Sequence, residues 1–404
     1  MVTEADPPTG RRRPRVVVCG TKFGQVYLEA FRDPSLPFDL VGVLGQGSAR
    51  STSVARHYGV PLFTDVDELP DDVDMACVVV RGGLLGGPGV DIAKRLMSRG
   101  IHVVQEHPLH YDELADCLRH ARQNRVVYHL NSFYPHQAPV RRFIAAAREL
   151  LGRQRARYVD GACGFQVAYA MLDILGQSLG GVRPWGLADP PEPSSRLAGM
   201  LNKGLDVPFR SLDGVVAGVP LTLRVHNQLD PADPDGYAHL MHRVTIATEA
   251  GALTLVDTHG PTVWCPRPDF PKEVRESDVR PHFQDSPNVF GDHGDHFDVP
   301  STVVLGPATA PSYRAAFESV WPAGVARALD ELWQAAQRGD SPLPRGQYHL
   351  GLCQLWQDIT AKLGPPDLVR AEPIAHLRPD DVATLAEAAE AANAADTANT
   401  EVRA

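Results

Sequence analysis

The first residues that could do chemistry form a glycine-rich turn directly after a short apolar run. The turn is Gly20-Thr21-Lys22-Phe23-Gly24, and a helical pattern follows it. Glycines in such a turn let the backbone approach a pyrophosphate, and N–H groups at the start of the helix bind its negative charge. The turn departs from the G-x-G-x-x-G fingerprint, since Lys22 occupies the second glycine position and Gln25 the third. It favours dinucleotide binding, although any strand-to-helix turn can carry two glycines.

The segment after the second strand pattern bears on the kind of dinucleotide. A carboxylate that binds the ribose hydroxyls is expected about 20 residues beyond the turn, but Leu44–Ser51 contains none. Ser48, Arg50 and Ser51 are found there instead. Neutral donors and a guanidinium suit a 2′-phosphate, which a carboxylate would repel. The segment therefore predicts NADPH over NADH, with these three residues at the phosphate. The alternative is that Arg50 is an ordinary surface arginine.

Two more segments follow strand patterns and fall at the edge of a parallel sheet where ligands bind. The glycine-rich stretch Arg81–Gly89 follows the apolar run Asp74–Val80, and Gln105–Pro108 ends a later strand pattern. We expect both to border the nicotinamide half of the cofactor, with a flexible surface loop as the alternative for the first. The residues predicted to contact the cofactor there are Arg81, Gly82 and Glu106.

The elements that must position these residues alternate between strand and helix over the first 130 residues. Such alternation is typical of βαβ units and a parallel sheet. The predicted strands are Arg15–Cys19, Asp39–Leu44, Asp74–Val80, Ile101–Gln105 and Val126–Leu130. The predicted helices are Gly24–Asp33, Val90–Arg99 and Asp112–Asn124. The fold class predicted here is α/β, a Rossmann-type doubly wound sheet with the glycine-rich turn at the end of its first strand.

The pattern changes after about residue 131. An amphipathic helix is predicted over Gln137–Leu151, with Arg141 and Arg142 on its exposed face. Strand-like runs then follow without helices between them, so we expect an α+β domain with an open, largely antiparallel sheet. These runs are Leu221–Asn227, His242–Thr248, Ala252–Asp257 and Thr262–Cys265. The predicted limits are a disordered segment 1–13, an NADP-binding domain 14–132, a second domain 133–378, and a helical then disordered tail 379–404.

Composition narrows the classes of function. The 404 residues include 49 acidic and 39 basic side chains, and the formal charge of −10 argues against a nucleic-acid partner. No run of 18 apolar residues occurs and no signal-peptide core is visible, so we predict no membrane span and a cytoplasmic location. The six cysteines lack zinc-like spacing, and Asp292–His296 has no second cluster to close a site, so no metal is predicted.

Five segments together carry a family resemblance. They are Cys19–Tyr27, Gln105–Leu109, Asn131–Pro135, His226–Asp230 and Asp257–Pro261. In them the sequence resembles the glucose–fructose oxidoreductase/inositol dehydrogenase/MocA family, and within it the thiazolinyl imine reductases of siderophore biosynthesis. The resemblance covers most of residues 15 to about 370. It implies a Rossmann domain, a second domain with an open sheet, and a homodimer formed through that sheet.

Two departures from the wider family bear on the reaction. His107 stands where the family has the lysine of a Glu-Lys-Pro motif, and Ala170 falls where its sugar dehydrogenases have a proton-handling histidine. Because alcohol oxidation needs a base at the hydroxyl, the loss of both argues against a sugar dehydrogenase. Imine reduction needs a proton donor, and the resemblance implies Tyr134 in that role. His107 could share the role, or lower the pKa of the tyrosine and orient it, and water or the substrate could supply the proton. The structural alternatives are that Tyr134 is a packing residue at a domain junction and that His107 is a structural histidine bonded to the backbone.

The resemblance implies NADPH-dependent reduction of the C=N bond of a thiazoline ring to a thiazolidine. The implied substrate is a thioester bound to a carrier domain of a nonribosomal peptide synthetase in siderophore biosynthesis. Two alternatives stay open. One is an NADP-dependent sugar or cyclitol dehydrogenase of the same family. The other is a non-catalytic NADP-binding regulator or partner of the synthetase.

Overall fold

A computed structural model describes residues 12–82, 86–191, 196, 199–202, 206–233, 236, 238–267, 299–341, 343–371, 377–388 and 390. The chain falls into two compact units. The larger unit is Met1–Gln228 with Ala238–Asp367, and the smaller is Leu229–Tyr237 with Leu368–Ala404. Three predictions, for residues 1–11, for Asp292–His296 and for the end of the tail, lie outside the described residues.

The first sheet of the larger unit has six strands, all parallel, in the order β3-β2-β1-β4-β5-β6. The strands are β1 (Arg15–Cys19), β2 (Asp39–Leu44), β3 (Leu62–Phe63), β4 (Met75–Val78), β5 (His102–Glu106) and β6 (Tyr128–Asn131). The five predicted strands are confirmed, the first two with their exact limits. Because the chain reverses its direction of winding between β1 and β4, a crevice is expected at the carboxyl ends of these two strands.

Helices cover both faces of this sheet. They are α1 (Gly24–Glu29, continued by the 3-10 turn Ala30–Arg32), α2 (Ala49–His57), α3 (Gly89–Ser98) and α4 (Tyr111–Asn124). The three predicted helices are confirmed, and Gly100 follows α3 with φ +80° as a left-handed terminus. Helix α2 was not predicted. Two helices from the far end of the sequence also pack here, α10 (Trp321–Arg338) against α1 and β5, and α11 (Leu343–Leu363) against α4.

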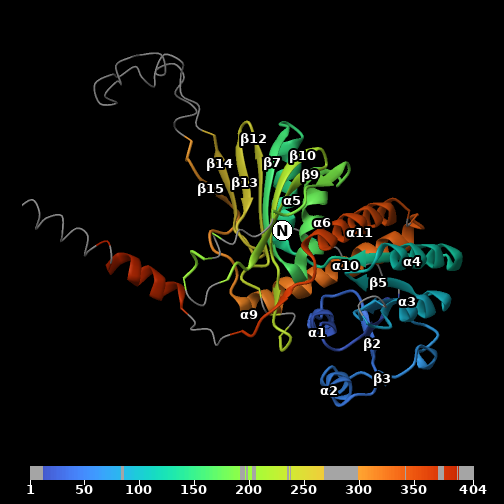
Figure 1. Cartoon of the computed structure of the whole chain (residues 1–404). Coiled ribbons are helices and arrows are strands. Elements are labelled where there is room, and N and C mark those ends of the chain that lie inside the picture. The colour runs from blue at the N-terminus through green and yellow to red at the C-terminus, as the bar shows by residue number, and fades with distance from the viewer. Residues whose placement is uncertain are drawn as a thin grey trace, which may run out of the picture. The chain divides into compact units, whose positions relative to one another are not determined.

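The second sheet has eight strands in the order β15-β14-β13-β12-β7-β10-β9-β8 (Figure 1). They are β7 (Ala156–Gly164), β8 (Trp185–Leu187), β9 (Phe209–Val216), β10 (Val219–His226), β12 (His242–Thr248), β13 (Gly251–Leu255), β14 (Thr262–Pro266) and β15 (Val303–Leu305). Every pair is antiparallel except β7 with β10. The predicted fold class is therefore confirmed.

Among the described residues, helices pack against one face of the second sheet. Helices α5 (Ala138–Leu151) and α6 (Ala168–Leu179) pack on that face, and α5 is the amphipathic helix predicted from the sequence. The other face is polar, because the strand register aligns a row of hydroxyls and carboxylates across it. The row is Thr254, Thr245, Asp160, Thr222 and Asp213.

The smaller unit has little regular structure. Asp230 accepts backbone hydrogen bonds from Ala232 and Ala371, and these bonds lower the pKa of its carboxyl. Residues 379–388 are helical and exposed, as predicted for the start of the tail. The short strands β11 (Gln228–Leu229) and β16 (Asp367–Leu368) pair with each other.

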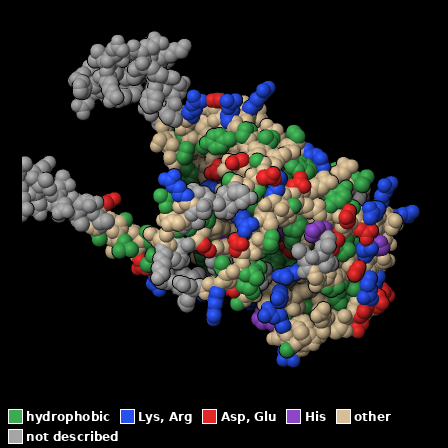
Figure 2. All heavy atoms as spheres, viewed as in Figure 1, with side chains coloured by type: hydrophobic (Ala, Val, Ile, Leu, Met, Phe, Trp, Pro, Cys, Tyr) green, Lys and Arg blue, Asp and Glu red, His purple; other side chains and the backbone are tan. Residues whose placement is uncertain are grey.

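Charged side chains of both signs are interspersed over the face drawn in Figure 2, in agreement with the sequence composition. None of the helices in the described part of the chain is long and apolar enough to cross a membrane.

Candidate active site

The predicted site residues converge on one edge of the first sheet. Because all six strands are parallel, the residues after β1, β4, β5 and β6 meet at the carboxyl edge of the sheet. Gly20 follows β1, Val79 follows β4, Glu106 ends β5 and Asn131 ends β6. The structure therefore gathers the glycine-rich turn, the Glu106-His107 pair and the segment that leads to Tyr134.

The turn after β1 has a shape that only glycine allows. Gly20 has φ +98°, and a Cβ on it would lie 2.4 Å from the carbonyl oxygen of Val79 in the loop after β4. A Cβ on Gly89 would lie 2.1 Å from the carbonyl oxygen of Val80. The backbones of the two loops are thus in direct contact at the point where the winding reverses. This side-chain-free cradle fits a dinucleotide, whose pyrophosphate needs close backbone approach.

The remaining residues predicted for the cofactor lie around this cradle. Thr21 and Phe23 are partly buried, Lys22 is exposed and Gly24 is buried under the turn. Arg81 is exposed in the next loop, whereas Gly82 is buried against Leu109 and Glu113. Part of that second glycine-rich loop, residues 83–85, lies outside the described residues.

The end of β2 is organised by a helix that the sequence pattern did not reveal. Ser48 is the N-cap of α2, and its Oγ accepts a hydrogen bond from the backbone N–H of Ser51 at 3.2 Å. The Ser51 hydroxyl is buried and donates to the carbonyl oxygen of Ser48 at 2.9 Å. Ser48 and Arg50 are exposed in the first turn, which contains no acidic residue. The capping hydrogen bonds already occupy Ser51, whereas Arg50 is accessible.

A buried polar network connects the ends of β5 and β6. The Tyr27 hydroxyl donates to Glu106 Oε2 and accepts from Asn131 Nδ2 at 2.5 Å. Glu106 Oε1 lies 2.9 Å from His107 Nδ1, which also lies 3.2 Å from the carbonyl oxygen of Asn131. Because both neighbours of this nitrogen are acceptors, His107 Nδ1 carries the hydrogen. Burial and the adjacent Glu106 raise the pKa of Tyr27 well above its ordinary value, so it stays a neutral phenol.

A strained turn places Tyr134. Phe133 has φ +63° and ψ −62°, and the backbone N–H of Tyr134 donates to the carbonyl oxygen of Ser132 at 2.7 Å. These values define a γ-turn, which is rare and strained for a residue with a side chain. Asn131 Oδ1 supports the turn by accepting from the N–H of Phe133 at 3.1 Å. The same asparagine therefore joins the Glu106 network to the turn that carries Tyr134.

Aromatic side chains from both domains surround Tyr134, which is 7 % exposed. The His242 ring from β12 meets it edge-on at 4.7 Å between centroids, and the Phe133 ring does so at 5.1 Å. Trp321 of α10 packs against Phe133 at 5.3 Å, and Phe23 of the glycine-rich turn packs against the same ring at 5.2 Å. One aromatic cluster thus connects the turn after β1, Tyr134 and helix α10.

His242 and His107 have different hydrogen-bonding states. In His242, Nε2 lies 3.1 Å from the carbonyl oxygen of Val167 and Nδ1 lies 2.8 Å from the Thr258 hydroxyl. Both ring nitrogens are therefore engaged, and burial lowers the pKa of His242 to about 3. His242 is a neutral packing partner of Tyr134. His107 stacks on Tyr169 at 5.3 Å, and its hydrogen bonds to described residues are made through Nδ1.

Ala170, which occupies the position of the proton-handling histidine of sugar dehydrogenases, has no titratable side chain. Ala170 lies on α6, is fully buried and belongs to the same apolar cluster as Phe133 and Tyr134. Three residues further along α6, Asp173 is buried and accepts hydrogen bonds from Ser132, from Tyr348 at 2.7 Å and from Gln177 at 3.0 Å. Burial alone would raise the pKa of Asp173, but His349 and these hydrogen bonds hold it below its ordinary value.

Sequence analysis did not find several residues of this centre. Tyr27, Tyr169, His242 and Trp321 were not predicted as site residues, because the tertiary fold brings them to this centre from distant parts of the sequence. Asn131 was not predicted either, although it lies three residues before Tyr134. Within the described ranges, no group of three or more His, Cys, Asp or Glu side chains is arranged to hold a metal ion.

Two family models match consecutive segments of the chain. Residues 14–132 match the oxidoreductase family with an NAD-binding Rossmann fold, and residues 154–265 match the C-terminal domain described as thiazolinyl imine reductase Irp3-like. Residues 14–132 therefore match the NAD-binding domain of this oxidoreductase family, and the chain is an NAD(P)-dependent oxidoreductase. Its second domain is of the thiazolinyl imine reductase type, as the sequence resemblance implied. No curated protein matches the sequence.

Solved structures share the fold at low identity. An oxidoreductase from Agrobacterium radiobacter in complex with NAD+, L-tartaric acid and magnesium has a TM-score of 0.58 at 11% identity, over 86% of this chain and 95% of that one. Biliverdin reductase from Synechocystis sp. PCC 6803, in complex with biliverdin and NADP+, has a TM-score of 0.55 at 14% identity, over 87% and 99%. UDP-N-acetylglucosamine 3-dehydrogenase GnnA from Acidithiobacillus ferrooxidans has 0.55 at 13%, over 86% and 97%.

Proposed function

We propose that this protein reduces the C=N bond of a thiazoline ring to a thiazolidine, with NADPH as cofactor. The substrate is a thioester carried by a nonribosomal peptide synthetase in siderophore biosynthesis. The observation that carries the proposal is a buried phenol, Tyr134, at the cofactor edge of the sheet, with Ala170 where an alcohol-oxidising relative would need a base. The match of residues 154–265 to the imine reductase domain supports it.

The residues of the site supply what imine reduction requires beyond the cofactor. A bound nicotinamide supplies a hydride for the imine carbon. The C=N electron pair then moves to nitrogen, which must take up a proton, and the Tyr134 hydroxyl is the donor that we propose. We propose that His107 in the adjoining network relays a proton from solvent to the tyrosinate. Its Nε2 would take up the proton and pass it on, while Nδ1 keeps its hydrogen between Glu106 and the carbonyl oxygen of Asn131. The aromatic wall around Tyr134 excludes water from this exchange.

The test is an assay with an acyl-thioester analogue of an aryl-thiazoline, with NADPH oxidation followed by absorbance. Turnover by the wild-type protein that depends on the thiazoline ring supports the proposal. Incubation with NADP+ and a panel of polyols provides the contrast, since robust alcohol oxidation would favour a sugar or cyclitol dehydrogenase. A protein that binds NADPH and turns over neither class of compound would instead be a regulator or partner of the synthetase.

We infer that NADPH is preferred over NADH because Arg50 is exposed in the first turn of α2, where no carboxylate is present. Arg50→Gln should lower kcat/KM for NADPH by about 10- to 100-fold, the range expected for losing a hydrogen bond to a charged group. The value for NADH should change little. Arg56→Gln, an exposed arginine later in the same helix, is the matched control. A wild-type preference for NADH would contradict the inference.

We propose that the chain forms a homodimer through the open face of the second sheet. This face carries a polar row that includes Asp160 and Thr222, with Arg224 3.6 Å from Asp160. Such a face can pair with a second copy through matched hydrogen bonds and charges. Sedimentation should give twice the mass of the chain at micromolar concentration, and a single monomeric species would contradict the proposal.

The six cysteines are all free thiols, which fits the reducing cytoplasm that we propose as its compartment.

A further inference from the structure

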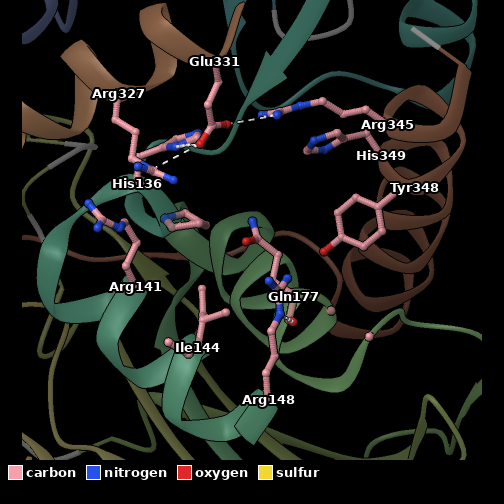
Figure 3. Close-up of a pocket in the computed structure, with 14 residues that line it drawn as sticks. His136, Arg141, Ile144, Arg148, Gln177, Arg327, Glu331, Arg345, Tyr348 and His349 are labelled. Carbon is pink, nitrogen blue, oxygen red and sulfur yellow. Dashed lines mark hydrogen bonds and ion pairs between the residues drawn. The ribbon is translucent and has the colours of Figure 1, made fainter. Parts of the chain in front are cut away.

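A cavity whose lining includes none of the cradle residues lies between four helices of the larger unit. Its volume is about 500 Å³, and each helix contributes residues from one face at helical spacing (Figure 3). Helix α5 presents Arg141, Ile144 and Arg148, whose spacing places them on the same side. The other lining side chains that matter here are Arg327 and Glu331 of α10, Gln177 of α6, and Arg345, Tyr348 and His349 of α11. We call this space the arginine cavity.

Positive charge in the arginine cavity exceeds negative charge. Four arginines line it, whereas Glu331 is its one lining carboxylate. Glu331 forms ion pairs with Arg327 at 3.2 Å and with Arg345 at 3.1 Å. The carboxylate of Asp173 lies behind the wall, with its oxygens taken by Ser132, Gln177 and Tyr348. His136 and His349 add no charge near neutral pH, because burial lowers the pKa of each to about 4.

Two of the arginines have no carboxylate partner. Neither Arg141 nor Arg148 makes an ion pair within the described part of the chain. The Nε of Arg148 donates to the carbonyl oxygen of Gln177 at 2.6 Å, which fixes the direction of its guanidinium without neutralising it. The buried Nε of Arg345 also has no hydrogen-bond partner among the described residues. The cavity thus concentrates guanidinium donors that a bound oxyanion would satisfy.

The chemistry of the lining defines the class of ligand. Guanidinium groups bind the oxygens of phosphate in pairs, and a doubly charged group suits two unneutralised arginines. Ile144 and Pro135 give the cavity apolar walls between the arginines, and its volume exceeds what an inorganic phosphate alone would fill. We propose that the arginine cavity is a binding site for an organic phosphate, with the phosphate held by Arg141 and Arg148 and the organic part against Ile144.

The position of the cavity gives this site a connection to the reaction centre. Pro135 and His136 line the cavity and directly follow Tyr134 in the same 3-10 turn. Helices α5, α6 and α10 all contact this turn. A ligand in the cavity therefore touches the segment that places Tyr134. The site goes beyond the proposed reduction and does not depend on it.

Isothermal titration of the full-length protein with pyrophosphate tests the site, with the cofactor cradle first saturated by NADPH. The wild type should bind one pyrophosphate, and the double variant Arg141→Gln/Arg148→Gln should bind it at least tenfold more weakly. Arg142→Gln is the matched control, because Arg142 is exposed on the same helix but does not line the cavity. The double variant Arg141→Lys/Arg148→Lys should retain most of the affinity if charge at these positions holds the phosphate.

Unaltered binding by the glutamine double variant, or no binding by the NADPH-saturated wild type at millimolar concentration, overturns the proposal. Melting temperatures of all variants, measured without pyrophosphate, separate a loss of binding from a loss of folding.

Titrations with inorganic phosphate, phosphopantetheine and phosphate-free pantetheine then distinguish the possible ligands of the arginine cavity. Tighter binding of phosphopantetheine than of inorganic phosphate supports an organic phosphate monoester as the ligand. Equal binding of the two contradicts a contact of the organic part with Ile144. Binding of pantetheine as tight as that of its phosphate ester contradicts the site.

Discussion

Tyr134→Phe should lower kcat for reduction of an aryl-thiazoline thioester by about 10²–10⁴-fold, the usual contribution of a positioned general acid. Phenylalanine keeps the ring that packs edge-on against His242 and Phe133. Only the hydroxyl is lost, so the γ-turn at Phe133 and the fold should be preserved. Steady-state kinetics at saturating NADPH measure the effect, and cofactor binding should stay within about twofold of the wild type.

His107→Asn gives the second half of this experiment. Asparagine can keep a hydrogen bond to the carbonyl oxygen of Asn131 but has no imidazole to exchange a proton. We expect a smaller loss in kcat than for Tyr134→Phe, since His107 acts through the tyrosine. If neither variant lowers kcat by more than about tenfold, well below the general-acid range, water or the substrate supplies the proton. That result would leave the fold and the cofactor site in place and remove Tyr134 from the chemistry.

The free energy of unfolding should fall steeply as the pH drops from about 6.5 towards 4.5. Four buried histidines have depressed pKa values, caused first by burial: His129 at about 2, His242 at about 3, and His136 and His349 at about 4. An unfolded histidine titrates near 6.5. Below pH 6.5 these histidines become protonated in the unfolded chain but stay neutral in the folded chain. Their contribution to the free energy of unfolding is therefore fully present above pH 6.5 and is lost as the pH falls. Each histidine contributes about 1.4 kcal/mol per pH unit in this window.

Urea unfolding between pH 7.5 and 4.5 measures this dependence. For the four histidines together the slope should be on the order of 5 kcal/mol per pH unit, enough to unfold an ordinary domain within two units. His136→Gln should reduce the slope by about 1.4 kcal/mol per pH unit, the contribution of one histidine, whatever its effect on the free energy of unfolding at pH 7.5. His57→Gln, at an exposed position of α2, should leave the slope unchanged. A stability that is flat from pH 7 to 5 would show that these imidazoles are accessible to protons in the folded protein.

The first sheet was predictable because its signals are local. The run Arg15–Cys19 is continuous, apolar and ended by a glycine that has φ +98° in the structure. Strand β7 was missed because Asp160 and Gly161 interrupt its apolar pattern, and its parallel partner β10 is distant in sequence. Helix α2 was missed because only three of its residues are buried, so it has almost no apolar stripe.

Some residues of the candidate site were also predictable from the local sequence, whereas others were not. Glu106 and His107 could be found because Glu106 ends a strand that the sequence locates and His107 directly follows it. Tyr134 lies three residues beyond the end of β6 and was indicated by the family resemblance. His242 and Trp321 come from elements more than 100 residues further along, and nothing in their local sequence indicates that they face Tyr134. Arg141 was predicted to lie on an exposed face, which is correct, but its place in the arginine cavity depends on three other helices.

The aromatic cluster has a consequence for the order of events in a catalytic cycle. Phe23 lies in the loop that would clasp the coenzyme, and through Phe133 it shares packing with Trp321, which flanks Tyr134. A coenzyme that contacts Phe23 would therefore alter the packing of Phe133 and Trp321 beside Tyr134. We expect the coenzyme to bind before the acyl substrate and to leave after the product. Product inhibition that is competitive between NADP+ and NADPH, and noncompetitive between the other pairs, checks this order.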